Sequence, residues 1–397
     1  MPDNFDDLFD RFMRYVKIET TSSEESGTSP STMTQHDLAK VLYEELTALG
    51  AEDVYYDEDH CYVYGGLPGY GEALGFIAHM DTSPAVSGKD VKPRIIKNYD
   101  GNDWLLKPGM FPELNNHLGE DLIATDGTTL LGADDKAGVA EIMFALRYLA
   151  GHPEISHRKI RVCFTPDEEI GAGVDHIDLE KFGAKEAYTV DGGKLGELEY
   201  ECFNAAWATV TVRGTSVHPG SAKNLMKNAS LLAIEFNSLL PAAERPEHTE
   251  GREGFYMLGE ISGSIDSATL KYIIRDHDRA KFEARKQTLE KITAFLNGKY
   301  GEGTFTLTMG DSYYNMIEVL RDHMELVENA RRVMAELGIT PIENPIRGGT
   351  DGARLSFMGI PCPNLCTGGY NYHGRYEYAS MQEMEKCAEI VLALMEG

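Results

Sequence analysis

The sequence predicts an α/β fold, with a mixed, largely parallel sheet covered by helices and a smaller α+β domain inserted into it. Three observations support this prediction. Short apolar segments alternate with amphipathic helical segments before Gly193, which is the pattern of a helix-covered sheet. The pattern then changes to longer strands and long helices. The first pattern returns from about Tyr313, so the middle region is expected to be an insertion.

Two amphipathic helices open the chain. Apolar residues recur three and four positions apart from Phe5 to Val16, which lines one face of a helix. A second helix is expected from about Thr34 to Leu49, with Gly50 as its C-terminal stop. The elements expected next are strands at residues 62–64, 74–78, 159–164 and 187–190 and a helix at 137–149.

The rest of the chain completes both expected domains. The inserted domain should hold a strand at 205–213, a helix near 223–240, a strand ending at 275 and a helix at 278–296. After it we expect a helix at 317–337, a glycine-rich turn at 347–352, a strand at 364–367 and a closing helix near 381–395. The expected domains are therefore residues 1–203 with 315–397, and residues 204–314. Residues 82–130 lack periodicity and are expected to form an extended loop.

Composition and charge narrow the class of protein. The 397 residues are 42% hydrophobic and 25% charged, as in a folded globular chain. The formal net charge of −27 would repel nucleic acid and anionic lipid, so neither is an expected partner. No apolar run reaches the roughly 18 residues that span a bilayer, and the first residues lack a signal-peptide pattern, so we expect a cytoplasmic protein. Six cysteines without paired spacing are expected to be reduced.

Acidic and histidine residues gather where the expected strands end. His79 and Asp81 directly follow the strand at 74–78. Open α/β sheets bind ligands at this carboxyl edge. Four further loops at the predicted edge offer an imidazole or a carboxylate, at residues 131–138, 164–169, 188–193 and 369–377.

Together these loops supply the groups that hold a pair of divalent metal ions. Such a pair, about 3.5–4 Å apart, needs two imidazoles, terminal carboxylates and one bridging carboxylate. Each residue taken singly is more often a surface or capping residue, so the prediction depends on the coincidence of five loops at one edge. Spacing alone does not decide between Asp134 and Asp135 as the bridge.

Several strings resemble the M20 metallopeptidase family. They lie at residues 78–84, 131–138, 164–169, 188–193, 217–220 and 347–352. The resemblance continues through residues 272–276, 311–316 and 368–374, so it covers essentially the whole chain. Within the family, the strings are most similar to those of aminotripeptidases. The resemblance implies a zinc-exopeptidase-like catalytic domain and an inserted lid or dimerisation domain.

The resemblance also implies two zinc ions per subunit and a role for each candidate residue. The implied ligands are His79 and Asp191 for one zinc, Glu169 and His373 for the other, and Asp134 as the bridge. The family's Asp-x-Lys pattern, completed here by Lys136, selects Asp134 over Asp135. Glu168 would be the general base, and Asp81 would orient His79.

Four residues are candidates for substrate handling. The resemblance implies that His218 donates a hydrogen bond to the carbonyl oxygen as it becomes an oxyanion. Arg275 could pair with a substrate carboxylate, although a salt bridge to Asp276 or Asp278 is its ordinary alternative. Asn228 and Arg347 are weaker candidates for substrate binding.

The resemblance implies an enzyme that releases the N-terminal residue from tripeptides, and a homodimer paired through the inserted domain. Another M20 activity, such as that of a dipeptidase, a carboxypeptidase or an N-acyl-amino-acid hydrolase, is the nearest alternative, because the metal ligands do not separate these activities. A catalytically silent peptide-binding protein is a further alternative. It would be expected to lack Glu168 or a ligand, and the sequence retains them all.

Overall fold

The structure is a computed structural model that describes residue 2 and residues 4–397. Contacts divide the chain into two compact units. Unit 1 comprises the residues up to Tyr200 together with Glu318–Asn344 and Thr350–Gly397, and unit 2 comprises Glu201–Ile317 and Pro345–Gly349. The short segment Pro345–Gly349 thus belongs to unit 2, although the residues before and after it in the sequence belong to unit 1.

Unit 1 is built on a seven-stranded sheet. In spatial order its strands are β1 (Glu52–Tyr56), β2 (Val63–Leu67), β6 (Arg158–Thr165), β3 (Tyr70–His79), β7 (Glu186–Val190), β13 (Asn364–Leu365) and β8 (Leu198–Glu199). The four central strands β6, β3, β7 and β13 are mutually parallel, and the remaining pairs are antiparallel. The predicted mixed, largely parallel sheet is confirmed.

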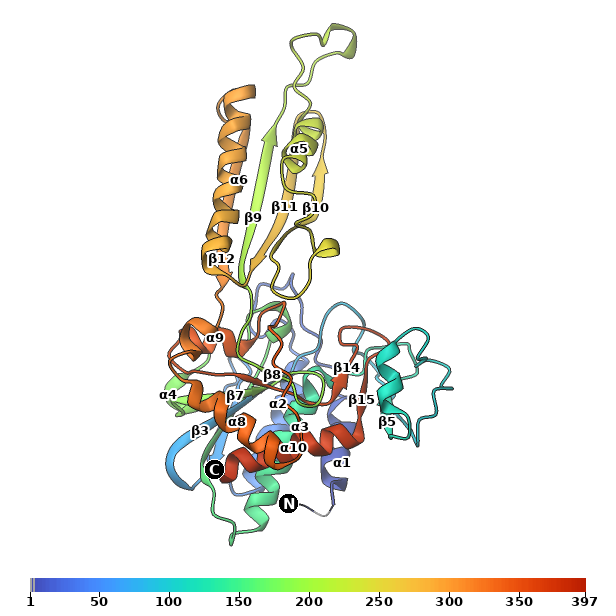
Figure 1. Cartoon of the computed structure of the whole chain (residues 1–397), viewed down its shortest axis with the longest axis vertical. Helices are drawn as coiled ribbons and strands as arrows, with labels where there is room; N and C mark the ends of the chain where they lie inside the picture. Colours follow the sequence, from blue (N-terminus) through green and yellow to red (C-terminus); the bar gives the residue numbers. More distant parts are fainter. Residues whose placement is uncertain (1, 3) are drawn as a thin grey trace. The chain divides into compact units, whose positions relative to one another are not determined.

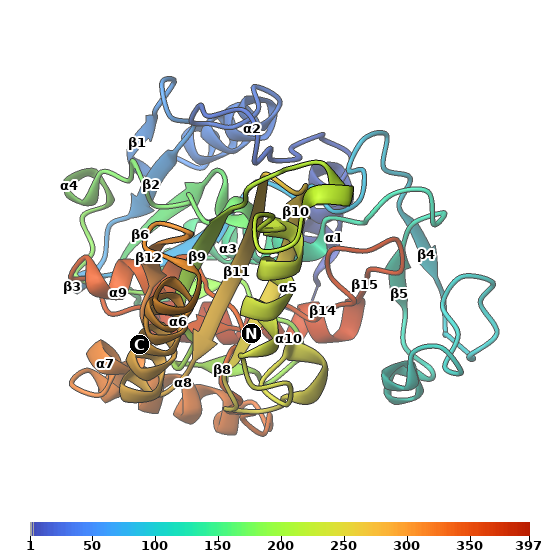
Figure 2. The same ribbon diagram turned by 90° about the horizontal axis from the view of Figure 1, so that it is seen from above.

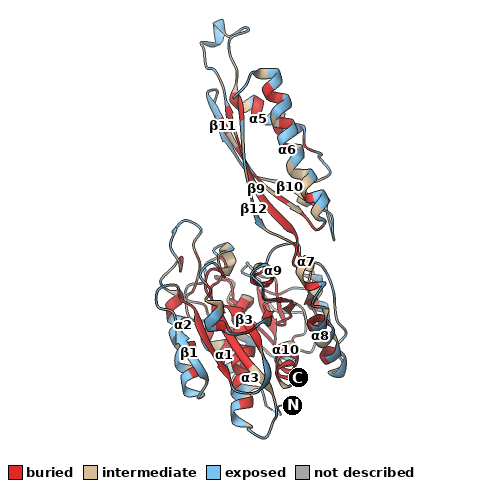
Figure 3. Ribbon diagram, turned by 90° about the vertical axis from the view of Figure 1, so that its left-hand side faces the viewer, coloured by how far each residue is buried: buried red, intermediate tan, exposed pale blue. Residues whose placement is uncertain are grey.

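Helices cover both faces of this sheet (Figures 1 and 2). Alternate residues of β3 point to opposite faces, so Phe76 packs into one core and Ile77 into another. The core around Phe76 receives α1 (Asp6–Tyr15), α2 (Gln35–Ala48), α3 (Ala133–Gly151), α8 (Met324–Glu336) and α10 (Met381–Glu396). The core around Ile77 receives α4 (Leu179–Phe182) and α9 (Asp351–Phe357). Figure 3 shows the resulting burial of β3 between the helices.

The segment 82–130 is not the extended loop that the sequence predicts. It contributes β4 (Arg94–Ile96), the short helix η1 (Pro112–His117) and β5 (Leu122–Ala124). These strands join β14 (Gly369–Tyr370) and β15 (Tyr378–Ser380) in a second, four-stranded sheet with its own small core. Strands of two or three residues are too short to display the period-two pattern that reveals a strand in sequence.

Unit 2 is an antiparallel sheet with two helices on one face. Its strands, in spatial order, are β10 (Phe255–Gly263), β11 (Ser267–Asp276), β9 (Asn204–Arg213) and β12 (Phe305–Tyr313). Every second residue of β9 and β11, including Val210 and Leu270, packs against α5 (Ala229–Ser238) and α6 (Arg279–Tyr300). Asp278 caps α6, because its side chain accepts a hydrogen bond from the backbone N–H of Lys281.

Several element boundaries differ from those expected. The helix predicted at 317–337 is two helices, α7 (Ile317–Leu320) and α8, and the helix predicted near 223–240 begins only at Ala229. The turn at 347–352 runs into α9, which the sequence did not predict. The strands β1, β10 and β12 were also not predicted. The other predicted helices and strands are present within a few residues of their expected bounds.

Two features bear on the wider class of protein. Among the described residues, no helix combines the length and apolar character that crossing a bilayer requires. All six cysteines are buried as free thiols. Cys366 and Cys387 lie close together, with 3.5 Å between their Sγ atoms.

Candidate metal centre

The candidate residues of unit 1 meet at the carboxyl edge of the central parallel strands. His79 is the last residue of β3, Glu168 and Glu169 follow its neighbour β6, and Asp191 follows its other neighbour β7. Asp134 lies in the first turn of α3. His373 comes from the loop after β14. Parallel strands bring their carboxyl ends to one edge, and this explains why residues so far apart in sequence lie together.

The carboxylate of Asp134 lies between the two imidazoles. Its Oδ1 atom is 2.9 Å from Nε2 of His79, and its Oδ2 atom is 3.1 Å from Nε2 of His373. Asp191 Oδ1 lies 3.4 Å from His79 Nε2, and Glu169 Oε2 lies 2.8 Å from His373 Nε2. Each imidazole therefore shares Asp134 and has one further carboxylate of its own.

These separations suit ligands of a shared metal pair. Ligand atoms bound about 2.0–2.1 Å from one tetrahedral zinc ion lie about 3.3 Å from one another. His79 Nδ1 is 3.0 Å from the main-chain carbonyl of Asp81, which can only accept a hydrogen bond. When the ring is neutral, its proton is thereby held on Nδ1, and the lone pair on Nε2 is directed at the carboxylates. Glu169 Oε1 is buried and, within the described part of the chain, has no hydrogen-bond partner. A second ligand atom is thus available on Glu169, and the residues fit a divalent metal pair.

The neighbouring Asp135 is engaged differently from Asp134. Its Oδ2 accepts a hydrogen bond from the backbone N–H of His79 at 3.1 Å, and its Oδ1 accepts one from Gly138 at 3.2 Å. Asp135 can be grouped with His79 and Asp191 by distance, but its Oδ2 already fastens α3 to the end of β3 and its Oδ1 accepts within α3 itself. The geometry therefore favours Asp134 as the bridge.

Crowded carboxylates shift the pKa values of this cluster. Burial raises the pKa of Glu169 to about 7 and that of Asp191 to about 6. Hydrogen bonds to Asp134 and Glu169 raise the pKa of His373 to about 10. Burial alone would lower the pKa of His79, but the negative charge of Asp191 and the hydrogen bond to Asp134 outweigh it and raise that pKa well above its usual value. The cluster attracts positive charge, which is a property of a cation site.

Glu168 is adjacent to the cluster, and Asp81 holds it in place. Glu168 Oε2 lies 4.0 Å from His79 Nε2. Burial and the negative charge of Asp191 raise the pKa of Glu168 well above its usual value. The two carboxylate oxygens of Asp81 accept hydrogen bonds from the backbone N–H groups of Glu168 and Glu169, at 3.0 and 3.2 Å. Asp81 therefore fixes the loop after β6 as well as His79.

One residue of the site, Glu377, was missed by the sequence analysis. It is buried, and its carboxylate accepts hydrogen bonds from the backbone N–H groups of Leu131, Gly132 and Asp134, at 2.7, 2.8 and 3.1 Å. Burial raises its pKa to about 7. Glu377 thus sets the position of the loop that carries Asp134. Its only signal in sequence is its place in the loop 369–377, which also carries His373.

A cavity of about 570 Å³ opens beside the cluster. Glu169 and His373 form part of its wall. The rest of the lining comes from Ser22, Ser23, Glu24, Glu25, Ser83, Pro84 and Ala85. It is large enough to receive a small molecule next to the candidate ligands.

The other four candidates lie in unit 2. Asn228 and His218 each accept one hydrogen bond from a nearby backbone N–H group. The Asn228 side chain caps α5 by accepting a hydrogen bond from Leu231 at 3.3 Å, which leaves its NH₂ group to donate elsewhere. Nδ1 of the exposed His218 accepts a hydrogen bond from the backbone N–H of Gly220 at 3.1 Å. The neutral ring then carries its proton on Nε2.

The two candidate arginines differ in their surroundings. Arg347 donates to the backbone carbonyls of Gly251 and Glu253, at 2.6 and 3.1 Å, and to Thr249. Arg275 donates only to the carbonyls of Ile274 and Ala206, at 3.0 and 3.4 Å, and forms no ion pair with any residue that the structure describes. The salt bridge considered from sequence is not formed, because Asp276 pairs with Arg285 at 2.8 Å and Asp278 caps α6.

Comparison with known proteins defines the class first. Residues 200–304 match the model of the M20 peptidase dimerisation domain. The solved aminopeptidase PepT of Bacillus cereus has a TM-score of 0.79 at 27% identity, over 99% of this chain and 98% of that one. A tripeptidase of Staphylococcus aureus gives 0.80 at 23% identity over the same shares, which supports the fold alone. The fold and its inserted domain are those of an M20 metallopeptidase.

Full-length relatives then identify the particular family. Peptidase T of Alkaliphilus oremlandii is 53% identical over 403 aligned residues, and that of Halothermothrix orenii is 54% identical over 401. Both alignments cover 98% of this chain and 98% of the relative. The chain belongs to the peptidase T family of M20 metallopeptidases. The resemblance drawn from the sequence strings is confirmed.

Proposed function

We propose that this chain is a two-zinc aminopeptidase that releases the N-terminal residue of tripeptides. The observation that carries the proposal is the position of Asp134 between His79 and His373, with Glu168 beside them. The names of its full-length relatives, peptidase T, support the same activity. We assign catalysis to residues 1–203 and 315–397.

The proposed ligands divide between two sites. His79 and Asp191 would hold one zinc ion, and Glu169 and His373 the other, with Asp134 shared by both. When bound, the ions would supply Lewis acidity to the attacking water and to the peptide carbonyl. Imidazole and carboxylate ligands suit zinc, although other divalent metals of the first transition row accept the same set.

Glu168 would move the proton. A carboxylate at this position can accept a proton from the attacking water and deliver it to the amine that leaves. Between the two steps the same carboxylate would hold the proton. Asp81 would orient both Glu168 and His79 through the contacts described above.

Unit 2 would contribute the residues that read the substrate. His218 has an Nε2–H that can donate to the carbonyl oxygen as negative charge develops there. The guanidinium of Arg275 can pair with the C-terminal carboxylate, and the free NH₂ group of Asn228 can donate to a peptide carbonyl. Arg347 would act indirectly, by holding the loop 249–253.

The assembly would be a homodimer paired through residues 204–314. The match to a dimerisation domain supports this arrangement. We place the enzyme in the cytoplasm, where its six free thiols would stay reduced.

A panel of peptides tests the proposed activity. The zinc-loaded protein is given di-, tri- and tetrapeptides of one composition and one N-acyl amino acid, and the products are identified by mass. We expect fast release of the N-terminal residue from tripeptides, with slower cleavage of the other lengths. Cleavage at the C-terminal bond, or a preference for the acyl amino acid, would reject the proposed activity in favour of another M20 reaction.

A further inference from the structure

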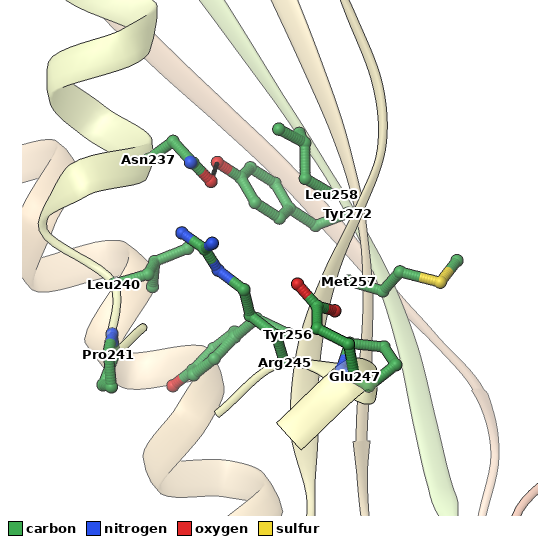
Figure 4. A pocket seen from close by; sticks show the side chains of 10 residues that line it. Asn237, Leu240, Pro241, Arg245, Glu247, Tyr256, Met257, Leu258 and Tyr272 are labelled. Carbon is green, nitrogen blue, oxygen red and sulfur yellow. Dashed lines mark hydrogen bonds between the residues drawn. The ribbon is translucent and has the colours of Figure 1, made fainter. Parts of the chain in front are cut away.

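Unit 2 contains a polar cavity that the proposed reaction does not use. It encloses about 170 Å³ between the end of α5, the strands β10 and β11, and the short helix η4 (Pro246–His248). The nearly buried aromatic rings of Tyr256 and Tyr272 line it, and Figure 4 shows the side chains that surround it. A bulk water occupies about 30 Å³, so the space corresponds to roughly six waters, which suits a single amino acid better than a peptide.

Two opposite charges face this cavity without meeting. Figure 4 shows the side chains of Arg245, which is half-buried, and Glu247, which is exposed, rising from the η4 segment with the guanidinium and the carboxylate apart from each other. Neither forms an ion pair or a side-chain hydrogen bond with another residue in the described part of the chain. The neighbouring Glu244 pairs instead with Arg285. The positive charge of Arg245 opposes the rise that burial causes in the pKa of Tyr272, which agrees with its inward position.

A polar donor lies on the same side as Arg245. The side-chain oxygen of Asn237 accepts a hydrogen bond from the hydroxyl of Tyr272 at 3.1 Å. Its NH₂ group therefore remains available near the guanidinium, as Figure 4 shows. Together they offer a fork of N–H donors of the kind that binds a carboxylate. The remaining walls are apolar and include Leu240, Pro241 and Leu258.

The loop that carries both charges is held at its two ends. The backbone N–H of Tyr256 bonds to the carbonyl of Glu244 at 2.9 Å. Arg347 fastens the other part of the loop through Gly251 and Glu253. A site formed in advance loses less conformational entropy when a small ligand binds.

We propose that this cavity binds a free α-amino acid with an apolar side chain. Arg245 and Asn237 would bind the α-carboxylate, Glu247 the α-ammonium, and the apolar wall the side chain. A zwitterion of this size would satisfy both charges at once. The inference rests on unit 2 alone and does not require the proposed function.

The first test uses the full-length, zinc-loaded protein and L-selenomethionine. Because free amino acids are also products of the proposed reaction, the bound molecule must be located as well as detected. Crystals soaked in L-selenomethionine should show anomalous selenium density in the cavity lined by Arg245 and Tyr272. Density confined to the sheet edge of unit 1, or absent altogether, would overturn the proposal.

The second test measures affinity by titration calorimetry. L-methionine should bind at least tenfold more tightly than L-methionine amide, which lacks the carboxylate, or N-acetyl-L-methionine, which lacks the ammonium. Arg245→Gln and Glu247→Gln should each weaken binding at the cavity at least tenfold, and Arg245→Lys less. Arg213→Gln and Glu302→Gln, on exposed residues of the same unit, are matched controls that should leave binding unchanged. Equal binding of the three ligands by the wild-type protein would reject the site even if a variant failed to fold.

Discussion

The sheet edge of unit 1 and the polar residues of unit 2 differ in how their charges are balanced. At the sheet edge, buried carboxylates crowd around His79 and His373, and positive charge is in short supply. In unit 2, Arg245 and Arg275 have no carboxylate partner among the described residues. The first arrangement calls for cations, and the second calls for ligands that carry a carboxylate.

A charge with its partners in place indicates a structural role instead. Arg347 lies in one of the strings that carry the family resemblance, yet its donors are used by the loop that it holds. Arg275 lies in another of these strings and keeps unused donors. A charged side chain that has no partner among the described residues is therefore a stronger functional candidate than one of the same residue type whose partners are present.

The largest expected effect comes from Glu168→Gln at the sheet edge. The amide keeps the shape of the carboxylate but cannot accept a proton, so kcat should fall about 10²- to 10⁴-fold while zinc content stays at two per chain. Metal analysis and tripeptide turnover on one preparation check this. Glu154→Gln, on an exposed residue of unit 1, is the matched control. Near-normal turnover by zinc-replete Glu168→Gln would remove Glu168 from the mechanism.

A mixing experiment tests whether His218 serves the site of the partner subunit. His218→Ala and Glu168→Gln should each be almost inactive alone. After subunit exchange at equal concentration, half of the dimers are mixed and one of their two sites is intact, so about a quarter of wild-type activity should return. The double variant mixed with itself is the control. Mixed dimers that stay inactive would show that His218 does not act across the dimer.

Arg275→Met and Arg347→Met should differ in how they affect tripeptides with and without a C-terminal carboxylate. Loss of a charge-assisted pair with the C-terminal carboxylate should lower kcat/KM for tripeptides about 10- to 100-fold. C-terminally amidated tripeptides, which lack that charge, should be affected little. Arg347→Met should slow acid and amide alike, because its role is to hold a loop. If Arg275→Met slows both substrates by one factor, Arg275 is structural too.

The charge imbalance of the sheet edge predicts how zinc binding varies with pH. In the zinc-free protein His373, with a pKa of about 10, and His79, whose pKa is also raised, hold protons at neutral pH that must leave when zinc binds. Affinity should therefore rise about tenfold per pH unit for each proton released. Below pH 7 the slope should steepen, because Glu169, with a pKa of about 7, is then protonated as well. Calorimetric titration of zinc into the metal-free protein, in buffers of different ionisation enthalpy, counts the protons released. A count of zero would contradict the assignment of His373 as a ligand.

The same comparison shows what the sequence could and could not predict. The strands β3, β6 and β7 were predictable because each is an apolar run followed by an acid or a histidine, and parallel strands must align those ends. The link between His373 and Asp134 was not predictable from spacing, since 239 residues separate them. The small sheet was missed because its strands, such as β4, are too short to show a period.

Residues that act through backbone groups were the hardest to predict. Glu377 holds the Asp134 loop by accepting from three backbone N–H groups, and backbone donors leave no mark on the sequence. The structural role of Arg347 depends in the same way on carbonyls of a distant loop. For such residues, only the three-dimensional structure shows which backbone groups they bind.

The smallest expected effect tests Asn228, whose side-chain oxygen caps α5 and whose NH₂ group is available to the substrate. Asn228→Ala removes both the cap of α5 and the NH₂ donor, so it should lower the free energy of unfolding by about 1 kcal/mol and also reduce kcat/KM a few-fold. Asn228→Asp keeps the capping oxygen and removes only the donor, so it should retain stability and lose the same activity. Asp278→Ala removes the cap of α6, where no substrate role is proposed, and should cost stability alone. Denaturant unfolding and tripeptide kinetics on the three variants separate the roles. Full activity in Asn228→Asp would leave Asn228 as a helix cap and nothing more.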